Sequence, residues 1–272
     1  MKRQLERYQK IERSLLTTYR AKIWAKFIKA IKEYDLIQPN DSICVCISGG
    51  KDSMILAKCF QELKRHSDFE FDVKYLVMNP GYNQKNLDKI KENLAILNVD
   101  AVIRDTDIFD VAYTQAKSPC YLCARMRRGY LYSYAQKLGC NKIALGHHFD
   151  DVIETILMNM LYTGHYSSMM PKLHSDNFEN MELIRPLYFV REKDIKSWVK
   201  FNNLNFIDCA CSVTKKNIGK RAEVKALVQE LNKMYKEADK CIFASSFNVN
   251  LNTVVGYKQK GVKHSFMDEY ED

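Results

Sequence analysis

The sequence predicts an α/β fold in which a parallel β-sheet is covered by helices on both faces. Short apolar segments alternate with helical segments over residues 43–163, and this alternation is typical of parallel strands joined by helical crossovers. Hydrophobic residues make up 46% of the 272 residues, which is enough for a sizeable core. Helical additions are predicted before and after the sheet.

The expected elements follow in chain order. Residues 1–37 are predicted as a basic helix because Leu15, Ile23 and Phe27 recur at helical spacing among Lys and Arg. Strands are predicted at 43–47, 71–78, 101–103, 142–145 and 183–187. Helices are predicted at 54–65, 86–97, 127–138, 152–163, 193–201 and 221–238. We therefore expect a basic helix at 1–37, an α/β domain at 38–200 and a helical segment at 201–272.

The charge of the chain favours polyanionic partners. The 42 Lys and Arg residues exceed the 33 Asp and Glu residues, for a formal net charge of +9, and each phosphate that a protein neutralises releases counterions. No apolar run approaches the roughly 20 residues that span a bilayer. Residues 1–7 lack the apolar stretch of a secretory signal. A cytoplasmic protein with no membrane partner is expected.

A candidate phosphate-binding loop directly follows the first predicted strand. It reads Ser48-Gly49-Gly50-Lys51-Asp52-Ser53. A loop between a strand and a helix presents unpaired N–H groups at the positive end of the helix dipole, and glycines let an anion approach the backbone closely. The spacing differs from the Walker pattern. A plain glycine turn is the alternative, but the serines and Lys51 favour phosphate binding.

A pair of carboxylates follows the predicted strand at 142–145. Asp150 and Asp151 close the run Gly146-His147-His148-Phe149-Asp150-Asp151. Two carboxylates near phosphate suggest Mg²⁺, which prefers oxygen ligands and substrate phosphates. The alternative is that one of them caps the next helix.

Four of the nine cysteines lie in two short motifs. Cys120 and Cys123 form a C-x-x-C that is expected in a turn, and Cys209 and Cys211 form a C-x-C. Three kinds of site compete, namely a four-thiolate zinc site, a redox pair and an iron–sulfur cluster held by three thiolates. Spacing alone slightly favours zinc.

Several blocks together resemble one enzyme family. The loop S-G-G-K-D-S resembles the PP-loop of the ATP pyrophosphatases, and G-H-H-x-D-D-x-x-E-T at 146–155 is similar to a block of tRNA-modifying PP-loop enzymes. The run C-Y-L-C-A-R-M-R-R-G-Y-L-Y at 120–132, with residues 184–187 and 191–195, resembles the tRNA 2-thiocytidine synthetase family. The resemblance covers residues 20–250 and is specific because the blocks occur together.

The resemblance implies a Rossmann-like sheet of the PP-loop ATPase (adenine nucleotide alpha-hydrolase-like) type, with residues 38–200 as the PP-loop ATP pyrophosphatase domain. It implies ATP, Mg²⁺ and a [4Fe-4S] cluster as cofactors, tRNA as partner, and a persulfide or sulfide source as sulfur donor. Related enzymes are often homodimers. The implied reaction adenylates the C2 oxygen of a pyrimidine, a cytidine in the anticodon loop, and replaces it with sulfur. The alternatives are a nucleotide-binding regulatory protein with structural zinc, or thiolation of another base.

The resemblance also implies roles for individual residues. Cluster ligands would be Cys120, Cys123 and one cysteine at 201–272, for which Cys209 is preferred over Cys211. The catalytic set would be Cys120, Cys123, Arg127, Asp52 and Asp151, with Arg127 stabilising transition-state charge. The nucleotide-binding set would be Ile47, Ser48, Gly49, Gly50, Lys51, Asp52, Ser53, Met78, Gly146, Asp150 and Asp151. Arg125 is expected on a solvated helix face.

Overall fold

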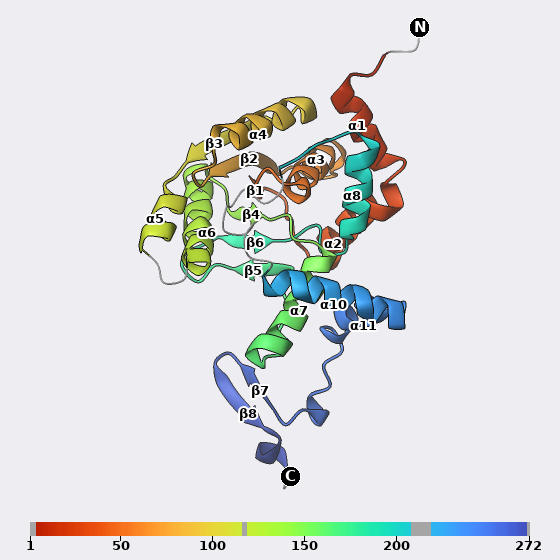
Figure 1. Ribbon diagram of the computed structural model, residues 1–272, viewed down its shortest axis with the longest axis vertical. Helices are drawn as coiled ribbons and strands as arrows, with labels where there is room; N and C mark the ends of the chain where they lie inside the picture. The colour runs from red at the N-terminus through yellow and green to blue at the C-terminus, as the bar shows by residue number, and fades with distance from the viewer. Residues whose placement is uncertain (1–3, 116–118, 208–218, 271–272) are drawn as a thin grey trace. The chain divides into compact units, whose positions relative to one another are not determined.

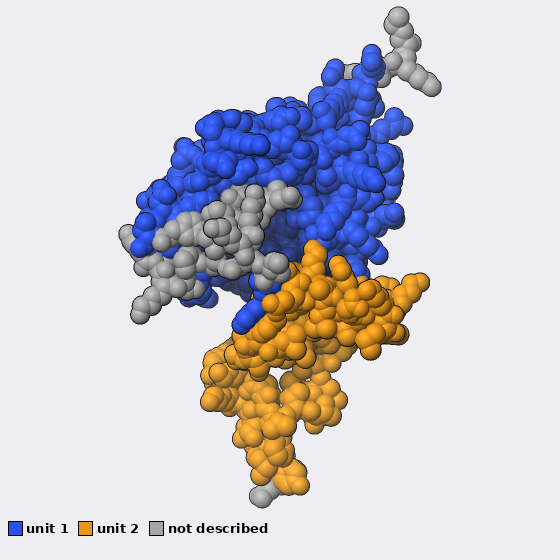
Figure 2. All heavy atoms as spheres, viewed as in Figure 1, with its two compact units in different colours: residues 1–152, 169–220 blue, residues 153–168, 221–272 orange. Residues whose placement is uncertain are grey.

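The computed structural model describes residues 4–115, 119–207 and 219–270. The chain forms two compact units, which Figure 2 colours separately. Unit 1 comprises residues 1–152 and 169–220, and unit 2 comprises residues 153–168 and 221–272. The predicted β-sheet lies entirely within unit 1.

The sheet of unit 1 has six strands. In spatial order they are β3 (Ala101–Asp105), β2 (Asp72–Asn79), β1 (Ser42–Ile47), β4 (Lys142–Ala144), β6 (Glu182–Ile184) and β5 (Lys172–His174). All neighbours are parallel except β5, which pairs antiparallel with β6 at the edge. Every residue of β1 after Ser42 is buried. Such a strand is a continuous apolar run in sequence, which is why β1 is predictable.

Helices cover the two faces of this sheet. Those of unit 1 that follow β1 are α3 (Lys51–His66), α4 (Gln84–Leu97), α5 (Ile108–Gln115), α6 (Pro119–Lys137) and α8 (Glu192–Phe201). Helix α7 (Phe149–Thr163) begins in unit 1 and continues in unit 2. Figure 1 shows α3 and α6 on opposite sides of the sheet. Cys44 and Cys46 of β1 pack with Tyr132 and Ala135 of α6, while α3 contacts β1, β2 and α8. The predicted α/β fold with a mostly parallel, covered sheet is therefore confirmed.

The N-terminal region forms three helical segments where the sequence predicts one helix. They are α1 (Arg7–Leu16), the π-helical turn η1 (Arg20–Trp24) and α2 (Ala25–Glu33). The break falls at Thr17 and Thr18, and β-branched residues are weak helix formers. The apolar stripe persists across the break, because Leu15, Ile23 and Phe27 are all fully buried.

Unit 2 contains a β-hairpin that the sequence analysis does not predict. Its elements after α7 are α10 (Lys220–Met234), α11 (Ala238–Ser245), η2 (Leu251–Thr253), β7 (Gly256–Gln259), β8 (Val262–Ser265) and η3 (Phe266–Glu269). The hairpin turns at Lys260 and Gly261, whose φ angles are +50° and +85°. Two consecutive positive φ angles are the signature of a type I′ turn, for which Asn-Gly and Asp-Gly are the usual sequence signals.

Among the described residues, no helix is long and apolar enough to cross a membrane.

A buried ion pair joins α1 to α3. Lys58 of α3 is 0% exposed. Its Nζ donates to Glu12 Oε1 at 2.7 Å, to Gln61 Oε1 at 2.6 Å and to the Leu97 carbonyl at 2.8 Å. Burial lowers the pKa of Lys58, and Glu12 opposes that shift. One ammonium therefore links α1, α3 and the end of α4.

We expect Lys58→Ala to lower the free energy of unfolding by about 2–6 kcal/mol, because Glu12 Oε1 and the Leu97 carbonyl both lose a buried donor and each such loss costs roughly 1–3 kcal/mol. Arg65 still pairs with the other oxygen of Glu12 at 2.8 Å. Urea denaturation measures this loss. Lys29→Ala is the matched control, since the Lys29–Glu33 pair is exposed and such pairs contribute less than about 1 kcal/mol. Equal losses in the two variants would contradict the assignment.

Candidate active site

The phosphate loop joins β1 to the first turn of α3. Gly50 precedes Lys51, the first residue of α3, so the N–H groups that begin this helix have no intrahelical partner. Ser53 Oγ accepts a hydrogen bond from Ser48 N at 3.1 Å and donates to the Gly50 carbonyl at 2.9 Å. These bonds hold the loop around a helix N-terminus, a geometry that binds anions.

Two glycines permit contacts that a side chain would prevent. Gly49 has φ +87°, and a Cβ there would lie 2.6 Å from Ile90 Cγ1. Gly146 follows β4, and a Cβ there would lie 2.9 Å from the carbonyl carbon and oxygen of Asp52 and 3.0 Å from Ser53 N. Those are backbone atoms in the first turn of α3, so no flexible side chain can give way. Gly146 therefore lets the segment after β4 lie directly against the phosphate loop.

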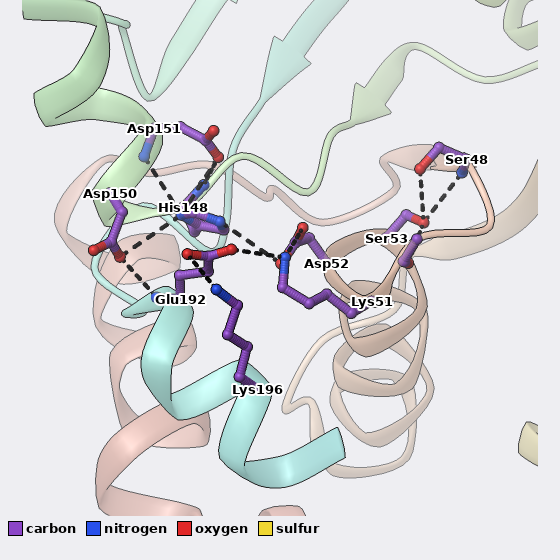
Figure 3. Close-up of polar contacts among 10 residues, drawn as sticks. Ser48, Lys51, Asp52, Ser53, His148, Asp150, Asp151, Glu192 and Lys196 are labelled. Carbon is purple, nitrogen blue, oxygen red and sulfur yellow. Dashed lines mark hydrogen bonds and ion pairs between the residues drawn. The ribbon is translucent and has the colours of Figure 1, made fainter. Parts of the chain in front are cut away.

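His148 lies among three carboxylates, as Figure 3 shows. Its Nε2 is 3.7 Å from Asp52 Oδ1, and its Nδ1 is 3.4 Å from Asp151 Oδ2 and 3.8 Å from Asp150 Oδ2. Asp151 Oδ2 accepts from His148 N at 3.0 Å, and His148 Nδ1 accepts from Asp151 N at 3.4 Å. The two residues thus cap the start of α7 reciprocally, in the manner of a capping box.

Unlike Asp151, Asp150 bonds to the start of α8. Its Oδ2 accepts a hydrogen bond from Glu192 N at 2.7 Å, and its Oδ1 is 3.7 Å from Arg191 Nε. A carboxylate at this position satisfies the first N–H of α8 and complements the helix dipole. Asp150 therefore connects the start of α7 to the start of α8.

Lys51 is held by two carboxylates (Figure 3). Its Nζ lies 3.0 Å from Asp52 Oδ2 and 3.0 Å from Glu192 Oε1. The other oxygen of Glu192 is 3.1 Å from Lys196 Nζ. Burial lowers the pKa of Lys51, but Asp52 and Glu192 outweigh burial, so the pKa is raised. Lys51 is therefore charged at neutral pH, as phosphate binding requires.

Two cavities meet at the phosphate loop. The first has a volume of about 460 Å³ and is lined by Cys46, Ile47, Ser48, Asp52, Ser53, Met78, Ala124, Arg127, Arg128, Leu131, Ile143, Leu145, Gly146, His147 and Asp151. The second has a volume of about 480 Å³ and is lined by Ser48, Gly50, Lys51, Asp52, Tyr82, Arg127, Val199, Leu204, Asn205, Phe206 and Ile207. Ser48, Asp52 and Arg127 line both cavities. Each cavity is of the size typical of small-molecule sites, roughly 300–1,000 Å³.

The structure brings together most of the residues that the sequence assigns to nucleotide binding. Those that line the first cavity are Ile47, Ser48, Asp52, Ser53, Met78, Gly146 and Asp151. Gly50 and Lys51 line the second cavity. Neither Gly49 nor Asp150 is among the residues lining these two cavities, because Gly49 lies against Ile90 and Asp150 is bonded to Glu192.

The C-x-x-C motif lies at the start of α6 and not in a turn. Pro119 is the first residue of this helix, a position where the missing N–H of proline costs nothing. Cys123 and Arg127 are four residues apart, so they occupy one face of α6. Arg125 is exposed and lines neither cavity. The side chain of Cys120 and all of Cys209 and Cys211 lie outside the described part of the chain.

Other residues at this edge of the sheet are not predicted from the sequence. The Tyr82 hydroxyl donates to the Ser48 carbonyl at 3.2 Å, and its place just after the end of β2 is the available signal, because ligands bind at the carboxyl ends of such strands. His147 Nδ1 accepts from Arg185 Nε at 3.2 Å. Burial lowers the pKa of Arg185 to about 10, so its guanidinium is still charged at neutral pH.

The carboxylates at the loop fit a Mg²⁺–nucleotide complex. Within the described ranges, no group of three His, Cys, Asp or Glu side chains is arranged to hold a metal ion. Asp52 Oδ1 is buried without a hydrogen-bond partner among the described residues, and Asp151 lines the same cavity. Mg²⁺ typically takes one or two carboxylates and completes its shell with substrate phosphates and water. Asp52 and Asp151 match that pattern.

The cysteine positions of α6 fit an iron–sulfur cluster. Cys123 follows Cys120 by three residues in the sequence, and its side chain lies on one face of α6. Thiolates are the usual ligands of such clusters. The same face continues to Arg127, which lines both cavities. A cluster on this face would therefore lie beside the phosphate loop.

The fold and the loop together define a class, an α/β domain that binds nucleotide phosphates at the carboxyl edge of its sheet. A family model described as a PP-loop domain matches residues 19–231. Two tRNA-cytidine(32) 2-sulfurtransferases, from Shewanella denitrificans and Aeromonas salmonicida, are 36% and 35% identical to this chain. Each match covers 85% of this chain, with 72% and 76% of the respective relative.

A solved structure has the same fold. The U34-tRNA thiolase NcsA from Methanococcus maripaludis with its [4Fe-4S] cluster matches with a TM-score of 0.66 at 20% identity, over 82% of this chain and 76% of that chain. The chain belongs to the PP-loop family and, within it, to the tRNA 2-thiocytidine synthetases. The family that the sequence blocks predict is thereby confirmed.

We expect Gly146→Ala to weaken ATP binding at least tenfold, which corresponds to about 1.4 kcal/mol. The new Cβ would overlap the Asp52 backbone and displace the phosphate loop. Calorimetric titration with a non-hydrolysable ATP analogue measures the effect. Gly129→Ala is the control, because a Cβ there meets nothing within 4 Å. If both variants bound the analogue equally well, the close approach would not be needed for binding.

Proposed function

We propose that the protein is an ATP-dependent tRNA sulfurtransferase that replaces the C2 oxygen of a cytidine in the anticodon loop with sulfur. The observation that carries the proposal is that Ser48, Asp52 and Arg127 line two cavities. A protein that only senses a nucleotide needs one cavity, whereas an enzyme that joins ATP to a second substrate needs two that meet at the phosphates. The relatives named tRNA-cytidine(32) 2-sulfurtransferase support tRNA cytidine as that substrate.

The first cavity suits ATP. Its apolar side contains Ile47 and Met78 at the ends of β1 and β2, where an adenine ring can pack. The triphosphate would lie on the loop at 48–53, with its charge balanced by Lys51 and the helix N-terminus. Asp52 and Asp151 would hold Mg²⁺, which supplies positive charge to the leaving pyrophosphate.

The first chemical step is adenylation of the base. The C2 oxygen attacks the α-phosphorus of ATP, a new O–P bond forms, and the bond from the α-phosphorus to the bridging oxygen breaks. Pyrophosphate leaves with the electron pair of that bond, and Lys51 and the loop N–H groups stabilise its charge. Arg127 lies between the two cavities, where its guanidinium can stabilise charge that develops on the α-phosphate.

The second step replaces oxygen with sulfur. Sulfide, as HS⁻, attacks C2, the C2–O bond breaks, a proton is released, and AMP leaves with the former base oxygen, so this step involves no net oxidation or reduction. A [4Fe-4S] cluster held by Cys120, Cys123 and Cys209, the last preferred over Cys211, would supply an iron with an open position for sulfur. Cys123 and Arg127 share a helix face, and Arg127 lines both cavities, so a cluster bound by Cys123 would lie on the side of α6 that faces the site. The sulfur donor is a sulfide source, or a persulfide whose outer sulfur two equivalents of a thiol reduce to sulfide while they form a disulfide.

We also propose that the protein acts in the cytoplasm as a homodimer. Unit 2 exposes large apolar side chains, including Met234 at 84%, Val255 at 78% and Tyr270 at 70% exposure. A dimer that covered these side chains would remove apolar surface from water, which favours association. Light scattering should report about twice the 31.8 kDa of one chain. A monomer at micromolar concentration would contradict the proposed dimer.

Deletion of the gene should remove 2-thiocytidine from total tRNA, as measured by mass spectrometry of nucleosides, and should leave other thiolated nucleosides in place. Anaerobically purified protein should be brown and contain about four iron atoms per chain. Loss of a different thiolated nucleoside would assign another base. A colourless anaerobic protein with stoichiometric zinc and an unchanged nucleoside profile would favour a regulatory nucleotide-binding protein.

Complementation of the deletion separates the arginines of α6. Arg127→Ala should lower the thiolation rate roughly 10²–10³-fold, the usual effect of removing one group that stabilises transition-state charge. Arg125→Ala is the matched control and should restore 2-thiocytidine, because Arg125 is exposed and lines neither cavity. If Arg127→Ala complemented as well as Arg125→Ala, Arg127 would have no role in the chemistry.

A further inference from the structure

The outer face of α8 carries three lysines and no acidic residue that is exposed. Lys193, Lys196 and Lys200 are all exposed, and their spacing of three, four and seven residues places them on one face of the helix. We call these three residues the α8 lysine face. The opposite side of α8 is apolar, with Ile195 and Trp198 both 0% exposed. The helix is therefore anchored by its core side and presents lysines outward.

Among the described residues, the acidic residues of α8 pair with only one lysine of this face, Lys196. Glu192 is shared between Lys51 and Lys196. Asp194 is buried and pairs with Lys26 of α2 at 3.5 Å. Within the described residues, neither Lys193 nor Lys200 has an ion-pair partner. Two of the three lysines are thus available for anions from outside the chain.

Basic residues of the N-terminal helices enlarge the positive region. Residues 7–33 contain eight Lys and Arg against two acidic residues, Glu12 and Glu33, and both of those are ion-paired. This segment packs along α8, with the Tyr19 hydroxyl 2.9 Å from Ser197 Oγ and Lys26 paired with Asp194. Figure 1 shows the N-terminal helices beside α8. Burial lowers the pKa of Lys26, and the charges of Arg191 and Lys193 lower it further although Asp194 opposes them, which reflects the density of cations here.

Helix α8 and the segment that follows it also line the second cavity. Val199, on the inner side of the same helix, lines that cavity, and so do Leu204 to Ile207 that follow the helix. Tyr82 and Phe206 add aromatic surface to the lining, and single-stranded RNA bases stack on such side chains. Glu192 binds both Lys196 of the α8 lysine face and Lys51 of the phosphate loop, so a single carboxylate links the two lysines.

We propose that the backbone of the substrate tRNA binds along the α8 lysine face, so that the target nucleotide enters the second cavity beside the phosphate loop. Residues 193 and 200 are about 10 Å apart along the helix axis at 1.5 Å per residue, a span that can contact successive backbone phosphates. The inference rests on the proposed function, because it assigns the second cavity to the RNA base.

The test is the salt dependence of tRNA binding to the full chain. Lys193→Ala/Lys200→Ala should raise the Kd for tRNA about tenfold and lower the slope of log Kd against log salt by about 1.4, since each single-strand phosphate contact contributes roughly 0.7. Lys196 is left intact because its partner Glu192 also holds Lys51. Binding of the ATP analogue and the melting temperature should stay at wild-type values.

Lys91→Ala/Lys137→Ala is the charge-matched control. Both lysines are exposed and lie outside α8, on α4 and in the last turn of α6. This variant should keep the wild-type Kd and salt slope for tRNA. If the α8 double variant kept them too while the wild-type protein thiolated tRNA, the α8 assignment would be wrong and the proposed function would stand. Failure of the wild-type protein to bind or thiolate tRNA would overturn both.

Discussion

The close contact between Gly146 and the backbone of Asp52 and Ser53 is the constraint on which the site depends. It joins the segment after β4 to the first turn of α3, and these are the two places where the sequence carries phosphate-binding and carboxylate residues. Strands β1 and β4 are neighbours in the sheet, so their carboxyl ends are already adjacent. Because residue 146 is a glycine without a Cβ, the backbone after β4 comes into van der Waals contact with the backbone of Asp52 and Ser53.

Helix α8 organises the charges around this contact. Its first N–H is bound by Asp150, its first side chain holds Lys51, and its inner face lines the second cavity. Lys51 thus has its ammonium oriented before any phosphate arrives, which reduces the entropy lost on binding. The carboxylate of Glu192 also binds Lys196. One side chain therefore contacts both a lysine of the phosphate loop and a lysine on the outer face of α8.

The sequence predicts the strands of the sheet well and the setting of the cysteines poorly. β1 and β2 are recognisable because buried parallel strands are continuous apolar runs. The strand β5 has only three residues at a sheet edge, too short for periodicity to reveal. α6 begins eight residues before its predicted start at 127, since the C-x-x-C motif has the composition of a turn but follows a proline that starts a helix. The hairpin of unit 2 turns at Lys-Gly, a weak signal for a type I′ turn.

The sequence by itself determined the class of this protein, because the phosphate loop and the carboxylate and cysteine blocks are local motifs whose spacing the chain carries directly. The tertiary structure alone decided how the two adjacent aspartates divide their roles. Asp151 caps α7 and lines the first cavity, whereas Asp150 binds the start of α8. It also brought Glu192 into contact with Lys51, which lies 141 residues earlier in the sequence. Neighbouring residues of a helix point in different directions, and contacts between distant segments depend on packing that no local pattern encodes.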